Sequence, residues 1–555
     1  MRFVFNFFIY TILFFSVINC AKKASPTGGP KDTIPPVLIS ASPKLNTIFF
    51  DKEEVKFLFN EYVKLNEIDK QLIISPPLKI GGYKLHPTMS ASKKITLSIL
   101  DTLLDNTTYT FNFGEGIEDY NEGNKMSFFS YTISTGAEID SLNLKGIIKD
   151  AIEMEPDDFI SLQLYPIDSS YNDSTIYNKK PFYVTSTLDS TVFEFKNLKA
   201  GKYELIALKD FSNNYFFNQN VDQIGFLNSP ITLPLDTIIE LNIFKEKTLF
   251  SWANPFFVND NHIGHGYYGD YDNQKFKLIS NVPKSFKYII TKNRETDTLN
   301  YWFKGITTDS LKFEYPINDT IKTELVNFKN PIKDSLIINQ LTIGALDLTE
   351  IFKVSSNLPI TSFDNSLVKI RKKDSTLVSS EIRIDENYDR VEIDFKLLPN
   401  DLYDIQLLPN ALKDFWGNTH DTLNYRVSTK KIEDYGNIFI QLIYEDSYEF
   451  ILELLKDNKV VRSYSKPVEN SNYPFEILNP GKYFLRLIKD KNNNDRWDTG
   501  NYLKKIQPEE VIYYPFELEL RANWDLNETF NTTQNYLDLL KTQTSSDTLE
   551  VNDDQ

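Results

Sequence analysis

The chain has 555 residues, of which 77 are acidic and 60 are basic, giving a formal net charge of −17. Beyond the N-terminal apolar run, Lys and Arg form no sustained basic stripe, which excludes a typical nucleic-acid-binding surface. A single cysteine excludes intramolecular disulfides and therefore small disulfide-stapled modules. The length predicts about four domains of ~150 residues each.

The N-terminus has the parts of a secretory signal peptide. Arg2 precedes an apolar run over residues 3–18, and polar residues begin directly after Cys20. The run is shorter than the about 20 apolar residues that a membrane-spanning helix needs. We therefore predict that residues 1–19 are a signal peptide and that Cys20 carries a lipid. Asn19 is larger than the small residue that usually precedes a lipidated cysteine, so an unmodified cysteine in an ordinary signal sequence stays as the alternative.

A flexible tether is predicted to follow over residues 20–32. Its Pro- and Gly-rich centre, from Ser25 to Pro30, has little apolar content, and such breakers continue to Pro36. Fully extended, residues 21–36 would span at most ~55 Å. The tether would therefore lift the first domain off a membrane surface.

Beyond the tether, short segments of alternating apolar and polar residues are separated by Asn, Asp, Gly and Pro clusters. Residues 160–164 and 203–207 are examples, and this spacing is typical of strands joined by turns. The predicted fold class is all-β, organised as tandem β-sandwiches. Residues 525–555 are polar and acidic and are predicted to be a disordered tail, with a short helix near residues 536–540.

An internal duplication organises the chain. Residues 195–203 align with residues 475–483 without a gap, and the same register continues to Asn218 and Asp498. A looser pair matches Tyr109 with Tyr403, and each member precedes its partner unit. The sequence thus predicts two modules, an intervening domain, and the same two modules again. The predicted boundaries are 33–137, 138–247, 248–340, 341–430 and 431–524.

Two sequence resemblances follow from these segments. Residues 35–40, 42–43, 59–63 and 74–77 resemble the SbsA-type bacterial Ig-like domain over about residues 33–136. With the Cys20 signal, the whole chain resembles an Ig-like-domain lipoprotein of Gram-negative bacteria, which implies an exported protein anchored in the cell envelope, at the outer membrane.

The other repeated module also has a family resemblance. Its Gly-Lys-Tyr turn, at Gly201 and again at Gly481, is similar to that of the transthyretin-like or carboxypeptidase-regulatory-like sandwich. This resemblance implies that each glycine occupies a turn and that Tyr203 and Tyr483 enter core strands.

The best candidate for site chemistry is the segment from Asp490 to Gly500. Its oxygen-bearing side chains fall at alternate positions, which is the opening spacing of a calcium loop. A glycine at the sixth position and a Glu at the twelfth are missing, so an Asx-rich turn that caps its own backbone is the alternative. The candidate calcium ligands are Asp490, Asn492, Asn494 and Asp498, with a weaker set at Asp210, Ser212, Asn214 and Asn218.

Four histidines are the remaining candidates for catalysis or transition-metal binding. His262 and His265 are close in sequence, but no third ligand is fixed by spacing, and their Gly-rich surroundings favour a mobile, solvated loop. His86 and His420 stand alone. The sequence carries no nucleophile elbow, zinc-protease pair or phosphate-binding Gly loop, so we predict that the protein is not an enzyme and has no certain cofactor.

Three functions are therefore compared. A non-enzymatic scaffold or interaction protein, built as a membrane-tethered rod, is favoured, and its envelope protein or glycan partner is unknown. A glycan-binding module would need exposed aromatic residues, for which Trp416 and Trp497 are the best candidates among the five tryptophans. A glycoside hydrolase would need a pair of converging carboxylates, which sequence spacing does not show.

Overall fold

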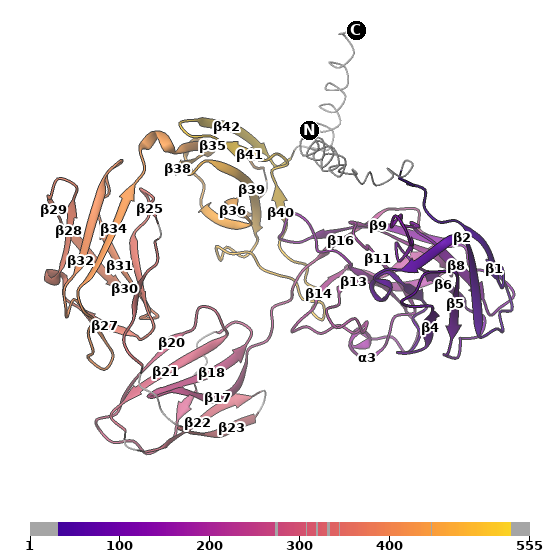
Figure 1. Cartoon of the computed structure of the whole chain (residues 1–555), viewed down its shortest axis with the longest axis horizontal. Helices are drawn as coiled ribbons and strands as arrows, with labels where there is room; N and C mark the ends of the chain where they lie inside the picture. Colours follow the sequence, from indigo (N-terminus) through magenta and orange to yellow (C-terminus); the bar gives the residue numbers. More distant parts are fainter. Residues whose placement is uncertain are drawn as a thin grey trace, which may run out of the picture.

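The computed structural model describes residues 31–533, except 272–275, 307, 318–319, 330–333, 343 and 446. The described chain folds into five β-sandwiches (Figure 1), which confirms the predicted all-β tandem organisation. Within this part, no helix is long and apolar enough to cross a membrane. Cys20, most of the tether and the predicted short helix at 536–540 lie outside the described residues.

The first sandwich packs the sheet β1-β2-β5-β4, with β7 paired to β2, against the sheet β3-β6-β8. Strand β2 alternates clearly, so Val55, Phe57 and Phe59 point into the core between outward-facing residues. Phe57 makes edge-to-face contacts with Phe113 and with Tyr131. The elements are β1 (Leu38–Ser42), β2 (Glu54–Leu65), α2 (Ile68–Gln71), β3 (Ile73–Ser75), β4 (Tyr83–His86), β5 (Ser92–Ile99), β6 (Thr108–Asn112), β7 (Ile117–Asp119) and β8 (Ser130–Ser134).

The second sandwich has the sheet orders β11-β10-β13-β14, with β15 paired to β13, and β12-β9-β16. Strand β16 runs parallel to β9, and the remaining pairs are antiparallel. The elements are β9 (Leu142–Asp150), β10 (Ser161–Pro166), α3 (Thr175–Asn178), β11 (Tyr183–Ser186), β12 (Val192–Leu198), β13 (Gly201–Lys209), β14 (Gln223–Phe226), β15 (Ile231–Leu233) and β16 (Ile239–Ile243).

The third sandwich packs β17-β18-β21-β20 against β19-β22-β23. Its core is mainly aromatic, with Trp252, Tyr301 and Phe313 among the buried rings. The elements are β17 (Ser251–Asn259), β18 (His262–Tyr268), β19 (Lys277–Leu278), β20 (Lys287–Lys292), β21 (Thr298–Lys304), β22 (Ser310–Ile317) and β23 (Thr320–Asn327).

The fourth sandwich contains the sheets β24-β26-β31-β30 and β25-β34-β32-β28-β29, and a β27-β33 pair. Because β24 pairs with β26, this unit begins before the expected boundary at 341. The elements are β24 (Ile338–Gln340), β25 (Ala345–Leu346), β26 (Phe352–Ser356), β27 (Ile360–Phe363), η1 (Asn365–Leu367), β28 (Val368–Lys372), β29 (Leu377–Val378), β30 (Ser380–Ile384), β31 (Arg390–Phe395), β32 (Leu402–Leu407), β33 (Leu412–Asp414), β34 (Leu423–Thr429) and η2 (Ile432–Asp434).

The fifth sandwich repeats the strand orders of the second, as β37-β36-β39-β40, with β41 paired to β39, and β38-β35-β42. Strand β42 lies within the tail predicted to be disordered, and for residues 525–531 that prediction was wrong. Alternation buries Phe530, and β42 pairs in parallel with β35. The elements are β35 (Gly436–Ile443), β36 (Glu449–Lys456), β37 (Lys459–Tyr464), η3 (Glu469–Ser471), β38 (Asn472–Leu478), β39 (Gly481–Asp490), β40 (Val511–Tyr513), β41 (Leu518–Leu520) and β42 (Asp525–Asn531).

The looser sequence pair also has a structural counterpart in the first and fourth sandwiches. The Tyr109 hydroxyl accepts the backbone N–H of Leu104 at 2.9 Å, and the Tyr403 hydroxyl accepts that of Leu398 at 2.7 Å. Both tyrosines are buried and close the same kind of corner. The matched residues therefore perform the same packing task twice.

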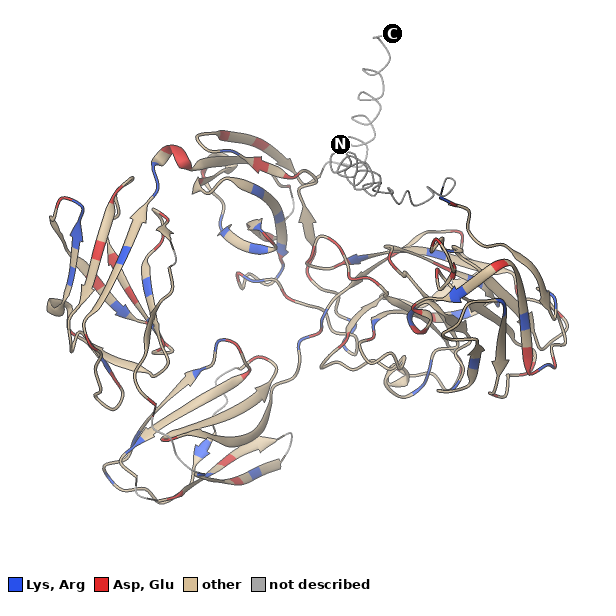
Figure 2. Cartoon of the chain, in the orientation of Figure 1, with Lys and Arg blue, Asp and Glu red and all other residues tan. Residues whose placement is uncertain are grey.

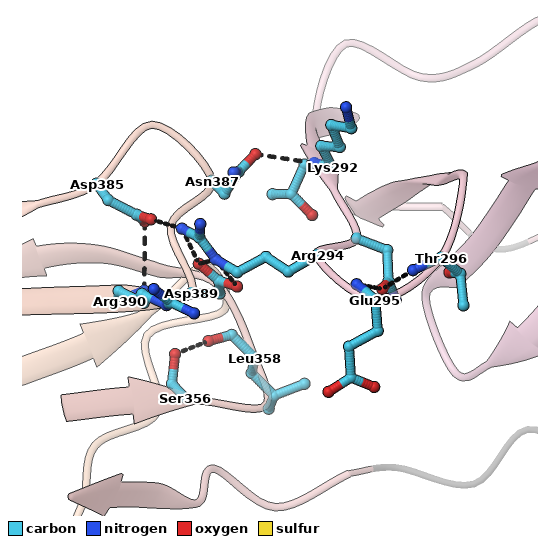
Figure 3. A network of polar contacts seen from close by, with 12 residues as sticks. Lys292, Arg294, Glu295, Thr296, Ser356, Leu358, Asp385, Asn387, Asp389 and Arg390 are labelled. Carbon is cyan, nitrogen blue, oxygen red and sulfur yellow. Dashed lines mark hydrogen bonds and ion pairs between the residues drawn. The ribbon is translucent and has the colours of Figure 1, made fainter. Parts of the chain in front are cut away.

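Polar side chains join the third sandwich to the fourth (Figure 3). Arg294 donates to Asp389 at 2.9 and 3.0 Å and also pairs with Asp385. The backbone N–H of Lys292 donates to Asn387 Oδ1 at 3.0 Å. A bidentate guanidinium fixes orientation as well as distance, so this joint has a defined angle.

Similar contacts join the first sandwich to the second and the fourth to the fifth. Between the first and second sandwiches, the backbone N–H of Val184 donates to Ser75 Oγ at 3.0 Å. Between the fourth and fifth, Asp347 accepts a hydrogen bond from Asn479 at 2.6 Å and one from the Tyr435 hydroxyl at 3.2 Å. These joints are specified by side chains as well as by the connecting segments.

The sandwiches do not form the predicted rod. The fifth sandwich returns to contact the second, so sandwiches two to five close into a ring, with the first sandwich attached to the second (Figure 1). Tandem sandwiches alone predict an extended chain, so closure of the ring depends on specific residues of the second and fifth sandwiches.

Candidate functional site

The two Asp- and Asn-rich segments occupy equivalent places in the duplicated sandwiches. The first Asx loop, residues 210–222, follows β13, and the second Asx loop, residues 490–509, follows β39. Asp210 accepts the backbone N–H groups of Asn214 at 2.7 Å and Tyr215 at 2.6 Å. Asp490 accepts those of Asn494 at 3.1 Å and Asp495 at 2.8 Å. The leading aspartate thus caps the same two positions in both loops.

A second carboxylate closes each loop, and sequence reasoning missed it. Asp222 accepts the backbone N–H groups of Phe211 at 3.1 Å and Asn218 at 2.8 Å. In the fifth sandwich, Glu509 accepts the equivalent backbone N–H groups, those of Lys491 at 2.7 Å and of Asp498 at 3.0 Å. Burial raises the pKa of Glu509, while these two N–H groups act in the opposite direction.

The oxygen-bearing side chains of the second Asx loop converge only in part. The amide groups of Asn492 and Asn494 both donate to Asp498 Oδ2 at 2.6 Å, whereas Asp490 faces backbone N–H groups. The two amides would present oxygens to a cation only after side-chain flips, which replace the two hydrogen bonds to Asp498 by contacts through the cation. Calcium binding here stays a prediction.

The first Asx loop brings its predicted ligands together less closely. Asn214 Oδ1 accepts the N–H of Phe216 and Asn218 Oδ1 accepts that of Asn220, while Ser212 donates its N–H to Asp210. Each side chain therefore serves its own turn. Across the described residues, no group of three or more His, Cys, Asp or Glu side chains is arranged to hold a metal ion.

The two loops differ by an insertion. Ten residues, 499–508, separate Asp498 from Glu509, whereas three residues, 219–221, separate Asn218 from Asp222. Strands β14 and β40 pair with equivalent positions of β13 and β39, so the seven additional residues lie wholly within this segment. We call residues 499–508 the inserted loop. An ungapped repeat that ends at Asp498 does not reveal it.

The inserted loop packs onto the second sandwich. Tyr502 is 0% exposed, and its ring lies 5.2 Å from that of Phe226 in an edge-to-face contact. It belongs to one buried cluster with residues of the second sandwich, namely Ala151, Tyr165, Ile176, Ile206, Leu208, Phe217, Ile224, Phe226 and Phe244. The hydroxyl groups of Tyr171 and Tyr502 lie 3.0 Å apart. One aromatic side chain therefore completes a core on the outer face of another sandwich.

Charged groups surround this ring. Lys505 Nζ lies 3.2 Å from Glu204 and 3.1 Å from Asp173, and 3.8 Å from the centroid of the Tyr502 ring. Glu246 accepts the backbone N–H of Tyr502. Burial raises the pKa of Glu204 and of Glu246, and Lys505 acts against that increase at Glu204.

The edge of β39 and β40 contributes a second point of contact. Arg486 Nη1 and the Tyr513 hydroxyl both donate to the Ile152 carbonyl, each at 2.8 Å. Arg486 also pairs with Glu453 at 2.7 Å. Where the second sandwich has an apolar Ile206, the fifth therefore has a paired arginine at the equivalent position.

A crevice of about 430 Å³ lies between the first and second sandwiches. Its walls include Phe128, Val192 and Glu194, and Glu194 pairs with Lys145 at 3.2 Å. The charges of Glu194 and Lys145 therefore pair with each other, and the lining supplies no converging set of catalytic side chains.

The histidine predictions need correction. His262 and His265 lie in strand β18, largely buried, and not in a mobile loop. His262 stacks on Trp302 with 3.7 Å between ring centroids, and His265 stacks on Trp252 at 4.3 Å. Burial lowers the pKa of each histidine to about 4. The segment is a core strand because both histidine rings pack against aromatic side chains, which bury them.

The other two histidines are also accounted for. His86 is exposed at the end of β4. His420 Nε2 accepts the N–H of Leu412 at 3.2 Å, and its Nδ1 lies 2.6 Å from the Asp421 carbonyl.

The tryptophans named as surface candidates are both in joints. Trp416 Nε1 donates to the Phe303 carbonyl at 3.1 Å across the joint between the third and fourth sandwiches. Trp497 packs against the buried cluster that contains Tyr502, and it donates to the Glu509 carbonyl at 3.0 Å. Trp524 is the more exposed tryptophan, at 52%, with the Arg521 guanidinium 5.0 Å from its ring.

Acidic and basic residues are interspersed over all five sandwiches (Figure 2). Many form local pairs, such as Lys149 with Glu240 at 2.8 Å and Arg426 with Asp404 at 2.6 Å. This mixture is consistent with a solvated surface.

Comparison with known proteins assigns the first sandwich. Residues 32–135 match the family described as the bacterial Ig-like domain. No curated protein sequence matches the chain.

Three solved structures are among those that the chain matches. Domains 1–6 of the surface layer protein SbsC are 10% identical, over 88% of this chain and 68% of that one, with a TM-score of 0.15. BcpA, the major pilin subunit of Bacillus cereus, is 10% identical over 71% and 99% of the two chains, with a TM-score of 0.14. A multidomain fragment of titin is 9% identical over 42% and 90%, with a TM-score of 0.14. None of these likenesses carries functional information.

Proposed function

We propose that the protein is an exported, non-enzymatic structural protein of the cell envelope, anchored by a lipid on Cys20 and presenting its sandwiches as an interaction scaffold. The observation that carries this proposal is that charged side chains join neighbouring sandwiches at several places. The exposed Arg294 and the buried Glu204 and Arg486 all make contacts of this kind. A scaffold requires domains held in a fixed relative orientation, and charged hydrogen bonds at the joints provide it.

The bacterial Ig-like domain at residues 32–135 supports the same proposal, because this sandwich immediately follows the predicted tether. A lipid on Cys20 and localisation at the outer membrane complete it. The partner would be another envelope protein or a glycan, and the exposed strand edges and loops offer the surfaces for it.

Membrane fractionation tests the anchor. The full chain and a Cys20→Ser variant are produced in a Gram-negative host and separated into soluble and membrane fractions. We expect the parent in the membrane fraction and the variant in the soluble one. Equal membrane association of both would contradict lipidation. Crosslinking followed by affinity capture from membranes would then identify the partner, and capture of no envelope component would contradict the scaffold role.

One observation favours glycan binding as a second candidate. The exposed ring of Trp524, with Arg521 against it, is a platform on which a sugar ring would stack. Envelope polysaccharide should then quench tryptophan fluorescence in the parent and not in Trp524→Ala. Equal quenching in both proteins would reject this platform.

A further inference from the structure

The second sandwich presents a surface that is complementary to the inserted loop. Around the Tyr502 ring, the second sandwich offers carboxylates and backbone carbonyls. The fifth sandwich supplies the donors: Thr499 to the Lys245 carbonyl at 2.5 Å, Gln507 to the Phe226 carbonyl at 2.9 Å, and Lys505 to Glu204. In each of these three hydrogen bonds, the donor belongs to the fifth sandwich and the acceptor to the second. The surface therefore recognises a cationic loop with an aromatic ring at its centre.

Shape adds to this charge complementarity. Gly500 lies against the Phe244 ring, and a Cβ atom at Gly500 would come within 2.6 Å of it. The backbone therefore approaches the second sandwich as closely as a residue without a side chain allows. Tyr502 fills the adjacent apolar space, so the contact combines a tight backbone fit with one aromatic anchor.

The duplication shows that this contact is an addition to the module. The second sandwich closes the equivalent loop with only three residues, 219–221, and the same kind of carboxylate, so the seven additional residues that reach the neighbouring sandwich occur only in the fifth sandwich. The fold of the module therefore does not require the inserted loop. Its Tyr, Lys and Gly residues are explained by the contact with the second sandwich.

We propose that the inserted loop holds sandwiches two to five in a closed ring, and that its release opens the ring into an extended chain. The closed state has the Tyr502 ring in the apolar cluster and Lys505 between Glu204 and Asp173. In the open state, these carboxylates and Lys505 return to water, so release leaves no unpaired charge in an apolar core. The inference goes beyond the proposed function and does not depend on the lipid anchor.

The balance between the two states follows from the chain itself. The fifth sandwich is connected to the second through the third and fourth, so the inserted loop stays at a high effective concentration near its binding surface. Contacts between domains of one chain resemble transient protein interfaces, and relative motion is expected where they are small and polar. Here one buried aromatic ring and a set of polar contacts stabilise the compact shape relative to the extended one.

The experiment measures a distance between the second and fifth sandwiches. The full chain after residue 19 has no cysteine other than Cys20, so a Cys20→Ser background accepts two spin labels at exposed positions, Thr237→Cys and Ser463→Cys. Pulsed electron spin resonance then reports the distance distribution. In one variant, residues 499–508 are replaced by the sequence of residues 219–221. A second variant carries Tyr502→Ser, and Leu503→Ser, at an exposed neighbour, is the matched control.

We expect the parent and Leu503→Ser to give one short, narrow distance population. The loop replacement and Tyr502→Ser should lose it in favour of longer, broader distances, while thermal melting confirms that the sandwiches stay folded. Retention of the short population in the folded loop replacement would overturn the proposal, because Arg486 and Tyr513 would then suffice for closure. A dipolar signal between singly labelled copies that disappears on dilution would assign the loop to a second copy and would also overturn it.

Discussion

The two Asx loops show how a repeated module acquires a new contact without losing its internal structure. Both loops keep a leading aspartate and a closing carboxylate, and both carboxylates accept equivalent backbone N–H groups. The second Asx loop then carries seven more residues between two fixed points. A loop whose ends are held by its own hydrogen bonds tolerates insertion well, because only the added segment must find new partners.

The largest expected effect comes from the third sandwich, which occurs once and is a reference outside the duplication. Folded His262 and His265 have a pKa near 4, whereas unfolded histidines ionise near pH 6.5. The unfolding free energy should therefore fall as pH decreases from about 6.5 to about 4, by on the order of 3 kcal/mol per histidine. Urea unfolding monitored by tryptophan fluorescence measures this loss.

A matched variant locates the effect. His265→Gln removes one ionising group, so its unfolding free energy should depend less on pH than that of the parent. An equal pH dependence in both proteins would contradict the assignment to this buried histidine.

Removing a leading aspartate tests whether the two loops are held alike. Asp210→Ala and Asp490→Ala each leave two or more backbone N–H groups without their charged acceptor. A hydrogen bond to a charged group contributes about 1.5–3 kcal/mol, so each variant should lose roughly 3 kcal/mol of unfolding free energy. Chemical denaturation checks this, and a loss confined to one loop would show that the duplication is not energetically equivalent.

Gly500→Ala tests the difference between the loops. The added Cβ would overlap both the Phe244 ring and the Ile506 carbonyl of the inserted loop, one of which must shift, and overpacking of this kind costs about 1–3 kcal/mol. The cost should fall on the contact between sandwiches rather than on either core. Hydrogen exchange should therefore increase at residues 499–508 and in β14, with the core strands β13 and β39 unchanged. Unchanged exchange at these positions would contradict the tight fit.

Calcium is expected to give the smallest effect, and to distinguish the loops. The second Asx loop offers two aspartates and two converging amides, whereas the first has one aspartate among its predicted ligands. Thermal melting with calcium and with chelator should differ for the parent and coincide for an Asp498→Asn variant. Coincident parent curves would reject calcium binding.

Much of the fold could be predicted from local patterns. Alternation identified the strands, and the ungapped match from Phe195 to Tyr203 identified the duplicated module, because core strands tolerate few insertions. Alternation also runs through β42, but the polar composition around it suggested a disordered tail. The segment is instead an ordered edge strand that pairs in parallel with β35, and its buried aromatic residue Phe530 anchors it to the core.

The site was harder to predict because its determinants are distant in sequence. Asp222 and Glu509 follow segments of different length, so no fixed spacing identifies them as the same group. From the sequence, Tyr502 looks like an ordinary tyrosine in a polar loop. Its packing partner Phe226 lies far away in the chain, so the sequence does not show that Tyr502 is buried. His262 and His265 look like loop residues beside glycines, and only the aromatic partners across the sheet show that they are buried.

Small-angle X-ray scattering from the full chain in dilute solution tests the closed ring most directly. We expect a compact pair-distance distribution that matches sandwiches two to five closed on one another, and a longer maximum dimension once residues 499–508 are replaced by the sequence of residues 219–221. An extended distribution for the parent, equal to that of the loop replacement, would contradict the ring.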